Sequence, residues 1–419
     1  MEKKHHGKHK MNCRFCNYKL KNIFVDLGKT PLANSYLSKE SDFKIEKEIP
    51  LNALICEKCF LIQVDEYEKP DEIFNNYAYF SSYSTSWLEH IKKFVNDTIE
   101  KFHISNNSQI IEIASNDGYL LKNFKEKNIP VLGIEPASNV AEIAKKSGIP
   151  TITNFFGTET VEKIVNSGKK ADILIAFNVL PHVPDLKDFV LGMKNILNEN
   201  GIIIIQFSAY LLDVIKKCEF DMVYHEHFSY FSLFTLKKIF ENFDLEIFDV
   251  KEIFVHGGSL RLFLKSSKNK EINIDENVEK LLKKEKDYGL QKISTYLNFQ
   301  NNVEKSKKNI QEFFIEAREQ KKKIVCYGAA AKGNTVLNYC NISKNDIDYV
   351  VDISPHKQGK FMPGTHIPIY SPEKIKETKP DYIVILAWNL KDEIMQQINF
   401  IKNWGGKFVV LIPEVEILK

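Results

Sequence analysis

Two pairs of cysteines constrain the fold of this chain more than any other feature. Cys13 and Cys16 form one Cys-x-x-Cys pair, Cys56 and Cys59 form a second, and 39 residues separate the pairs. Each pair turns two sulfurs toward one point, and four thiolates suit tetrahedral Zn²⁺. A module of about 60 residues is too small to build a full core, so zinc would replace part of it. The sequence therefore predicts a structural zinc site, with a redox pair or an iron–sulfur cluster as the alternatives.

The remaining composition narrows the class of protein. Of seven cysteines in 419 residues, Cys218, Cys326 and Cys340 stand alone and suit buried core positions better than nucleophiles. An odd cysteine count, without the apolar segment of a secretory signal, argues against a disulfide framework. Lysine plus arginine total 58 and aspartate plus glutamate total 55, so the net charge is small. A charge this small gives no reason to expect nucleic acid or an anionic membrane as a partner. We therefore expect a cytoplasmic monomer or homodimer that acts on a small molecule, with no nucleic-acid or membrane partner.

From residue 87 onward the hydrophobic pattern is that of an α/β protein. Helical spacing covers 87–102, whereas residues 27–50 are expected to form a loop. Strands are expected at 110–113, 131–134, 172–177 and 201–207, with helices at 118–127, 138–147, 158–167 and 185–199. A charged helical stretch at 272–320 precedes further strands at 323–328, 347–352, 381–388 and 407–413. Alternation of this kind calls for mostly parallel sheets covered on both faces. The expected fold class is α/β, with a small N-terminal zinc-binding module and two doubly wound Rossmann-like domains.

An acidic loop follows the first strand of the central block. It reads Glu112-Ile-Ala-Ser-Asn-Asp-Gly118, and its glycine allows a ligand to approach the backbone closely. Acidic groups suit an ammonium, whereas a dinucleotide fingerprint would be rich in glycine. Glu135, after the second strand, is placed to accept hydrogen bonds from two ribose hydroxyls. Together they predict an S-adenosylmethionine site, although each acidic residue alone also fits a helix cap. The cofactor-binding candidates are Glu112, Ser115, Asn116, Asp117, Gly118, Glu135 and Asn178.

Further polar segments stand at later strand ends. Asn178 and His182 follow the third strand, where ligands collect in such sheets, although a single histidine is often structural. The cluster Tyr224-His-Glu-His227 could supply a general base with an orienting partner. Metal ligation by His225 and His227, or plain packing, are the alternatives.

Two small-residue turns complete the set of candidate sites. His256-Gly-Gly-Ser-Leu-Arg261 brings a guanidinium that suits a pyrophosphate or sugar hydroxyls, with a simple hairpin turn as the alternative. Gly328-Ala-Ala-Ala-Lys-Gly-Asn334 could seat a phosphate on backbone N–H groups beside Lys332. Asp352 ends the next strand, in the position of a ribose ligand.

These segments, together with Tyr77-Ala-Tyr-Phe-Ser-Ser-Tyr-Ser84, resemble in order the sugar C-methyltransferase family. Its members join an N-terminal zinc-binding domain, a central S-adenosylmethionine-binding domain and a C-terminal Rossmann-like domain. The resemblance covers about residues 11–415. The expected domains are 11–75 for zinc binding, 76–270 for S-adenosylmethionine-dependent methyl transfer, 271–300 for a helical linker and 301–419 for sugar-nucleotide binding.

The resemblance implies that a methyl is added next to the ketone, typically at C-3, of a nucleotide-linked 4-keto-6-deoxy sugar through an enolate. It implies that His227 is the base, that Glu226 orients it, and that Asp117 and Glu135 hold the methyl donor. Hydrogen bonds to the keto or enolate oxygen would come from Tyr224, Tyr79 and His182. The substrate-binding candidates are His225, Ser259, Arg261, Lys332 and Asn334. The chain departs from the family at Gln206, where an acidic residue is frequent, so the wall of the sugar pocket near it is not defined by the resemblance.

Three other functions fit parts of the sequence. A zinc module beside a methyltransferase domain also suits an RNA methyltransferase, but a basic stripe with interleaved aromatic residues is missing from the sequence. A catalytically silent protein that binds sugar nucleotide and S-adenosylmethionine is the second alternative. An oxidoreductase that uses the C-terminal domain for NAD is the third.

Overall fold

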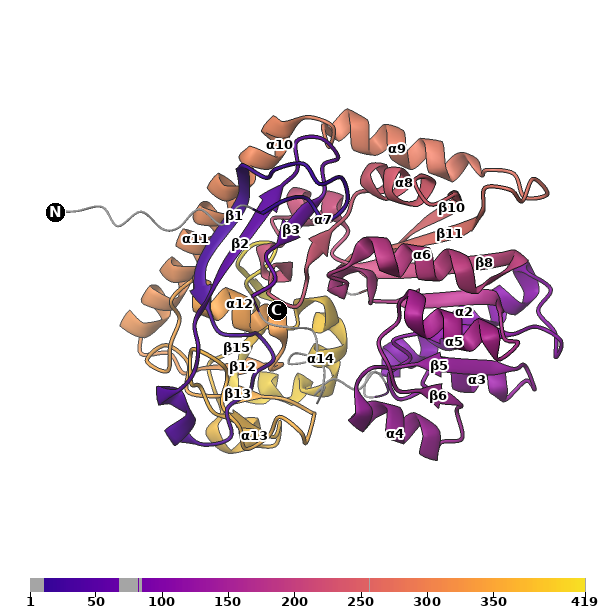
Figure 1. Ribbon diagram of the computed structural model, residues 1–419. Coiled ribbons are helices and arrows are strands. Elements are labelled where there is room, and N and C mark those ends of the chain that lie inside the picture. The colour runs from indigo at the N-terminus through magenta and orange to yellow at the C-terminus, as the bar shows by residue number, and fades with distance from the viewer. Residues whose placement is uncertain (1–10, 68–81, 83–84, 256, 419) are drawn as a thin grey trace.

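The computed structural model describes residues 11–67, 82, 85–255 and 257–418. In this part of the chain the strands form three sheets. One has four strands in the order β1-β2-β3-β9, one has seven in the order β10-β11-β8-β7-β4-β5-β6, and one has six in the order β14-β13-β12-β15-β16-β17. Helices cover the two larger sheets, which confirms the predicted α/β fold class (Figure 1).

The N-terminal module is built on an antiparallel sheet. Its strands are β1 Asn22–Thr30, β2 Ile49–Ile55, β3 Ile62–Val64 and, from far along the chain, β9 Ser229–Tyr230. The expected loop at 27–50 is wrong at both ends, since β1 runs to Thr30 and β2 starts at Ile49. Two register shifts in β1 disturb the alternation of buried and exposed residues that announces a strand. A short 3₁₀ helix, η1 Glu40–Lys44, lies between β1 and β2.

The central sheet contains all four predicted strands. They are β4 Ile110–Ile113, β5 Val131–Ile134, β7 Ala171–Phe177 and β8 Leu197–Ser208. All four pair in parallel, with the short β6 Thr151–Ile152 at one edge. The antiparallel hairpin β10 Leu245–Ile253 and β11 Ser259–Ser266 extends the other edge through β8. The interior strand β4 is buried on both faces, which explains why three of its four residues are isoleucine, although the fourth is the buried Glu112.

Of the described helices of the central domain, the first five lie close to the predicted ranges and the last two were not predicted. They are α2 Thr85–Lys101, α3 Leu121–Lys125, α4 Ser138–Lys146, α5 Thr158–Asn166, α6 Leu186–Ile196, α7 Leu211–Lys216 and α8 Leu233–Glu241. The 3₁₀ helices η3 Leu180–His182 and η4 Phe220–Met222 carry the polar segments that follow β7 and α7. Helix α6 begins where it does because the Asp185 side chain accepts the N–H groups of Lys187 and Asp188.

Three consecutive helices join the central and C-terminal sheets, and the last two of them also pack on the N-terminal sheet. They are α9 Glu276–Tyr288, α10 Ile293–Leu297 and α11 Phe299–Glu319. Helices α10 and α11 lie beside β1, whereas α9 packs on α8 and β10 (Figure 1). The Phe24 ring of β1 stacks on Phe299 with centroids 4.4 Å apart and meets Tyr296 edge-on. Helices α10 and α11 therefore contribute core to the zinc module as well as linking two domains.

The C-terminal sheet is parallel apart from its last strand. Its strands are β12 Ile324–Tyr327, β13 Val350–Val351, β14 Ile369–Tyr370, β15 Tyr382–Ile385, β16 Lys407–Val410 and the antiparallel β17 Glu416–Leu418. The helices are α12 Ala331–Tyr339, α13 Lys374–Thr378 and α14 Lys391–Gln397, with the 3₁₀ segments η5 Trp388–Leu390 and η6 Asn399–Trp404.

The N-terminal segment between β1 and β2 crosses onto the C-terminal domain. Leu37 forms a β-bridge with Phe361, and Glu46 pairs with His366 at 2.7 Å. Among the described helices none is long and apolar enough to cross a bilayer.

Candidate active site

One cavity of about 540 Å³ opens at the carboxyl ends of β4, β5, β7 and β8. All three parts of the chain line it. Asn34 comes from the N-terminal module, Lys332 and Lys357 come from the C-terminal domain, and the remainder comes from the central domain. The predicted site residues on its wall are Asn116, Glu135, Asn178, His182, Tyr224, His227 and Lys332. Ligands of open α/β sheets bind at this edge, so the position suits both a cofactor and an acceptor.

The loop after β4 is a strained turn that closes on the end of β5. Ala114, Asn116 and Gly118 have φ angles of 53°, 49° and 82°, a region that residues with a side chain rarely occupy. The Glu135 carboxylate holds the turn, because it accepts the N–H of Asn116 at 2.9 Å and that of Ala137 at 2.9 Å. A Cβ at Gly118 would lie 2.9 Å from Ile149 Cγ1, so glycine is required on two grounds. Strain of this kind is concentrated at binding sites.

Buried polar atoms beside this turn fit S-adenosylmethionine. Within the described residues, Glu112 Oε2, Ser115 Oγ and Asp117 Oδ1 have no hydrogen-bond partner. Burial raises the pKa of Glu112 well above its usual range, and burial raises the pKa of Glu135 to about 7. An ammonium group and ribose hydroxyls would bring the positive charge and the donors that these oxygens lack. Asn178, with a φ of 54°, is held by a bond from the Ser208 N–H to its Oδ1 at 3.1 Å.

A tyrosine and a histidine form a hydrogen-bonded pair on the cavity wall. The Tyr224 hydroxyl lies 2.7 Å from His227 Nε2, and His227 Nδ1 lies 3.1 Å from the Met222 carbonyl oxygen. Because a carbonyl only accepts, Nδ1 carries the ring proton and Nε2 accepts from Tyr224. Burial, with His182 nearby, lowers the pKa of His227 well below its usual value. His227 is therefore a neutral base with its lone pair aimed at Tyr224.

His182 stands next to this pair, with ring centroids 4.7 Å apart. Its Nδ1 lies 2.6 Å from the Glu226 carbonyl oxygen, so Nδ1 carries the proton and Nε2 has the lone pair. Burial lowers the pKa of His182 to about 4. In this tautomer Nε2 of neutral His182 can accept a hydrogen bond but cannot donate one to a ketone oxygen, as the predicted role would need.

Glu226 does not contact His227 in the predicted way. Its Oε1 accepts the backbone N–H of Asn34 at 3.3 Å and the Asn34 side-chain amide at 3.2 Å. Both ring nitrogens of His227 bond elsewhere, and the Met222 carbonyl takes the orienting role assigned to Glu226. Tyr79, the remaining catalytic candidate, lies outside the described residues.

The five substrate-binding candidates separate into two groups. Lys332 lines the cavity, where its Nζ donates to Asn389 Oδ1 and lies 4.7 Å from the centre of the Trp388 ring. His225, Ser259, Arg261 and Asn334 are buried and do not line the cavity that the described residues form. Each has a structural partner instead. His225 bonds to the Pro50 carbonyl, Ser259 to the Val255 carbonyl and Asn334 to the Ala33 carbonyl. Arg261 donates to Gln206 Oε1. Gln206, where the chain departs from the family pattern, therefore bonds to Arg261 and does not line that cavity.

Several residues at the site escaped the sequence analysis. Asn34 lies in the segment expected to be a loop, and only the fold reveals that it reaches Glu226. Lys357 lines the cavity, and its Nζ lies 2.7 Å from the Ala329 carbonyl oxygen and 3.4 Å from Asp352. Asp352 itself accepts the Ala329 N–H at 2.8 Å, so it braces the small-residue turn. The sequence signal that could have identified Lys357 is its position five residues after Asp352, the acidic residue that ends the preceding strand.

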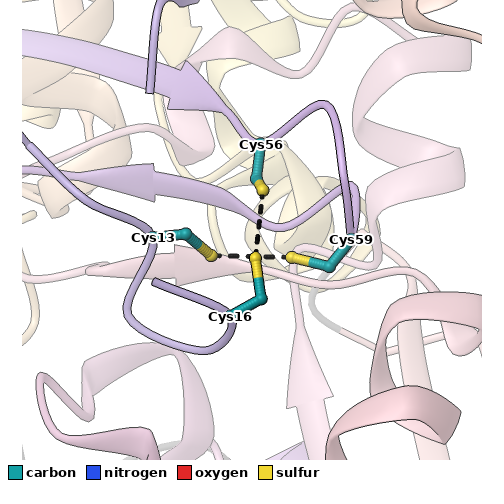
Figure 2. A group of neighbouring side chains, drawn as sticks. All are labelled: Cys13, Cys16, Cys56 and Cys59. Carbon is teal, nitrogen blue, oxygen red and sulfur yellow. Dashed lines mark hydrogen bonds between the residues drawn. The ribbon is translucent and has the colours of Figure 1, made fainter. Parts of the chain in front are cut away.

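The four cysteines of the two pairs converge on one point (Figure 2). The Sγ atoms of Cys13 and Cys59 lie 3.5 Å apart, as do those of Cys16 and Cys56, and all four lie within 4.8 Å of one another. Tetrahedral zinc with Zn–S bonds of 2.3 Å places its sulfurs about 3.8 Å apart. The donor set and its spacing therefore fit a structural zinc ion.

Comparisons with known proteins match three consecutive segments of the chain. The matching family models are "Putative zinc binding domain" at 13–74, "Methyltransferase domain" at 87–250 and "C-methyltransferase C-terminal domain" at 254–413. The last begins within the β10–β11 turn, although β11 belongs to the central sheet. The chain is 32% identical over 407 residues to the C-methyltransferase NovU of Streptomyces niveus, which covers 97% of this chain and 96% of that protein.

Two further similarities are partial. Over 100 residues the chain is 25% identical to a ubiquinone biosynthesis O-methyltransferase of Bartonella tribocorum, covering 24% of this chain and 40% of that protein. A solved S-adenosylmethionine-dependent methyltransferase from Clostridium acetobutylicum is 11% identical, covers 43% of this chain and 92% of its own, and has a TM-score of 0.34. A TM-score this low carries no argument.

Proposed function

This chain belongs to the S-adenosylmethionine-dependent C-methyltransferases, and from that premise we propose that it methylates a nucleotide-linked 4-keto-6-deoxy sugar at C-3, next to the ketone. The observation that carries the proposal is the Tyr224–His227 pair on the wall of the cavity. An amine acceptor is already nucleophilic and needs no such base, whereas a carbon next to a ketone must first lose a proton. A buried neutral base beside a hydroxyl donor is suited to that step.

In the proposed reaction, the Tyr224 hydroxyl turns from His227 Nε2 to the ketone oxygen. Nε2 then accepts the proton from C-3, and the electron pair of the broken C–H bond forms the enolate, whose oxygen keeps the Tyr224 hydrogen bond. Burial disfavours imidazolium in the free protein, but the adjacent enolate supplies a negative charge that stabilises it. His182 Nε2 accepts a neighbouring sugar hydroxyl.

The methyl donor supplies an electrophilic sulfonium methyl when it is bound. We assign its ribose to Glu135 and its ammonium group to the acidic loop at Glu112 and Asp117. The strained backbone at Asn116 and Asn178 supports this assignment, because it brings both amides to the cavity wall. The apolar lining by Trp87, Phe155 and Phe177 excludes water from the reacting atoms.

We assign the nucleotide diphosphate to the turn between β12 and α12. Ala330, Ala331 and Lys332 line the same cavity as His227, and Lys357 adds a second positive charge. Backbone N–H groups at a helix start and two lysines suit a diphosphate. The acceptor would then span the central and C-terminal domains, with its sugar at Tyr224.

The proposal is tested by incubating a panel of nucleotide-linked 4-keto-6-deoxy sugars with the protein and methyl-labelled S-adenosylmethionine in deuterated water. We expect one labelled methyl at C-3 and, without the methyl donor, deuterium at that carbon. His227→Asn should abolish both signals and keep S-adenosylmethionine binding. Binding of the methyl donor without transfer or exchange across the panel would exclude a keto-sugar acceptor of this type and would favour another acceptor or a binding protein.

A further inference from the structure

The zinc module extends directly into the segment that carries the Tyr224–His227 pair. Strand β9 begins two residues after His227 and is the fourth strand of the N-terminal sheet. It pairs with β3 through Ile62 with Tyr230 and Gln63 with Ser229. The cavity-wall segment is therefore anchored by a sheet whose other strands lie more than 160 residues earlier in the chain.

Arg14 links the cysteine pairs to this segment. It lies between Cys13 and Cys16, and its guanidinium bridges two carbonyls: Nη1 donates to Phe228 at 2.7 Å and Nη2 to Val64 at 2.6 Å. Its backbone N–H donates to Gln63 Oε1 at 2.9 Å. The Phe228 carbonyl also accepts the Val64 N–H at 3.0 Å, so it is held from two sides.

The chemistry of this contact requires arginine. The planar guanidinium offers donors in a fixed fork that can satisfy two carbonyls at once, whereas a lysine ammonium is a point charge on a flexible stem. The chain has three arginines, at 14, 261 and 318, among its 58 basic residues. In a sequence that otherwise uses lysine, an arginine inside a cysteine pair marks a position where the fork matters.

We propose that Arg14 is a positioning residue for methyl transfer: it transmits the geometry of the cysteine cluster, through the Phe228 carbonyl, to the Tyr224–His227 pair. This inference rests on the proposed function in treating that pair as the reacting base and donor. The peptide that carries the Phe228 carbonyl follows His227 by one residue, and the His227 N–H closes a turn on the Tyr224 carbonyl at 3.0 Å. A shift of Phe228 therefore moves both members of the pair. A misplacement of about 1 Å at reacting groups can cost about 100-fold in rate.

The test uses Arg14→Met, which keeps an unbranched side chain but loses both carbonyl bonds and the guanidinium over the Phe228 ring, and Arg14→Lys, which keeps the charge. Lys21→Met, an exposed lysine of the same module, is the matched control. Zinc content, S-adenosylmethionine affinity, kcat and KM are measured on each full-length protein. We expect kcat to fall by about 10- to 100-fold in Arg14→Met, less in Arg14→Lys and not in Lys21→Met, with zinc content and KM for the methyl donor unchanged.

A second readout separates this inference from the proposed function. The ¹⁵N resonances of His227, assigned with His227→Asn, report the ring tautomer and the bond from Tyr224, and they need no substrate. We expect the Nε2 resonance to shift in Arg14→Met and not in Lys21→Met, even if no sugar of the panel is methylated. An unchanged resonance overturns the inference, as does a loss of activity that follows loss of zinc in proportion, because Arg14 would then serve only the stability of the module.

Discussion

Replacing Tyr224 by phenylalanine separates the two roles of its hydroxyl, since it removes one oxygen and leaves the ring in place. In the free protein, the change deletes the 2.7 Å bond to His227 Nε2 and leaves that nitrogen without this donor. An unsatisfied polar group in a buried position costs about 1–3 kcal/mol. In the proposed reaction, the change removes the donor to the enolate oxygen. Loss of one such donor typically lowers kcat by about 100- to 1,000-fold, or about 2.7–4 kcal/mol.

The assay compares Tyr224→Phe with Tyr296→Phe, a buried tyrosine whose hydroxyl donates to the Leu290 carbonyl at 2.6 Å and which does not line the cavity. Both variants should lose a similar amount of stability, measured as the free energy of unfolding in urea. Only Tyr224→Phe should lose methyl transfer and deuterium exchange at C-3 by the stated factor, with unchanged affinity for the methyl donor. If Tyr224→Phe exchanges deuterium within a few-fold of the unmodified protein, the hydroxyl does not stabilise an enolate and the proposed mechanism is wrong.

Two more predictions concern charge at the site. The pKa of His182 is lowered to about 4 in the folded protein and lies near 6.5 in the unfolded chain, so the unfolded chain binds more protons between these pH values. The free energy of unfolding should therefore be unaffected by this group above pH 6.5 and should fall as the pH drops toward 4. The loss from this group should be at most about 3 kcal/mol. Urea unfolding at a series of pH values should show a shallower dependence in His182→Gln, and an equal slope in both proteins would contradict the lowered pKa. Lys332→Met should weaken binding of a nucleoside diphosphate sugar by about 10-fold or more, measured by calorimetry, and leave S-adenosylmethionine affinity unchanged. Lys322→Met, at an exposed ion pair with Asp381, is the control, and equal affinities in the two variants would show that the turn does not hold the diphosphate.

The architecture was predictable where local sequence determines it. Strands buried on both faces appear as short runs rich in isoleucine, Ile110 to Ile113 in β4 and Ile202 to Ile205 in β8, and the helices between them keep a 3.6-residue period. Cysteine spacing identified the metal cluster for a similar reason, because each pair forms one local turn. Strand β1 was hidden because its register shifts break the period of two, and β9 was hidden because two residues are too few to show any period.

The contacts that build the site depend on distant segments, and spacing does not reveal them. Asn34 and Glu226 are separated by 192 positions, and Arg14 and Phe228 by 214. A carboxylate next to a histidine in sequence suggests an orienting partner, but Glu226 turns to Asn34 while the Met222 carbonyl holds the His227 ring. Arg261 illustrates the same limit, since its guanidinium lies across the sheet on Gln206, with which it is paired in the β8–β11 register.

The way the cavity is assembled has a consequence for how the chain divides into functional units. The central sheet alone provides the cofactor loop and the His182 ring, but the carboxylate of Glu226 is bonded from the N-terminal module and the lysines come from the C-terminal domain. The segment 224–230 ends in a strand of the N-terminal sheet, so removing that module would expose the unpaired edge at Ser229 and Tyr230 and release the Phe228 carbonyl. An isolated central domain could therefore retain the methyl-donor loop and yet lack an ordered Tyr224–His227 pair. On this reasoning, binding of the methyl donor and proton abstraction are separable properties of the fold, and only the second requires all three parts.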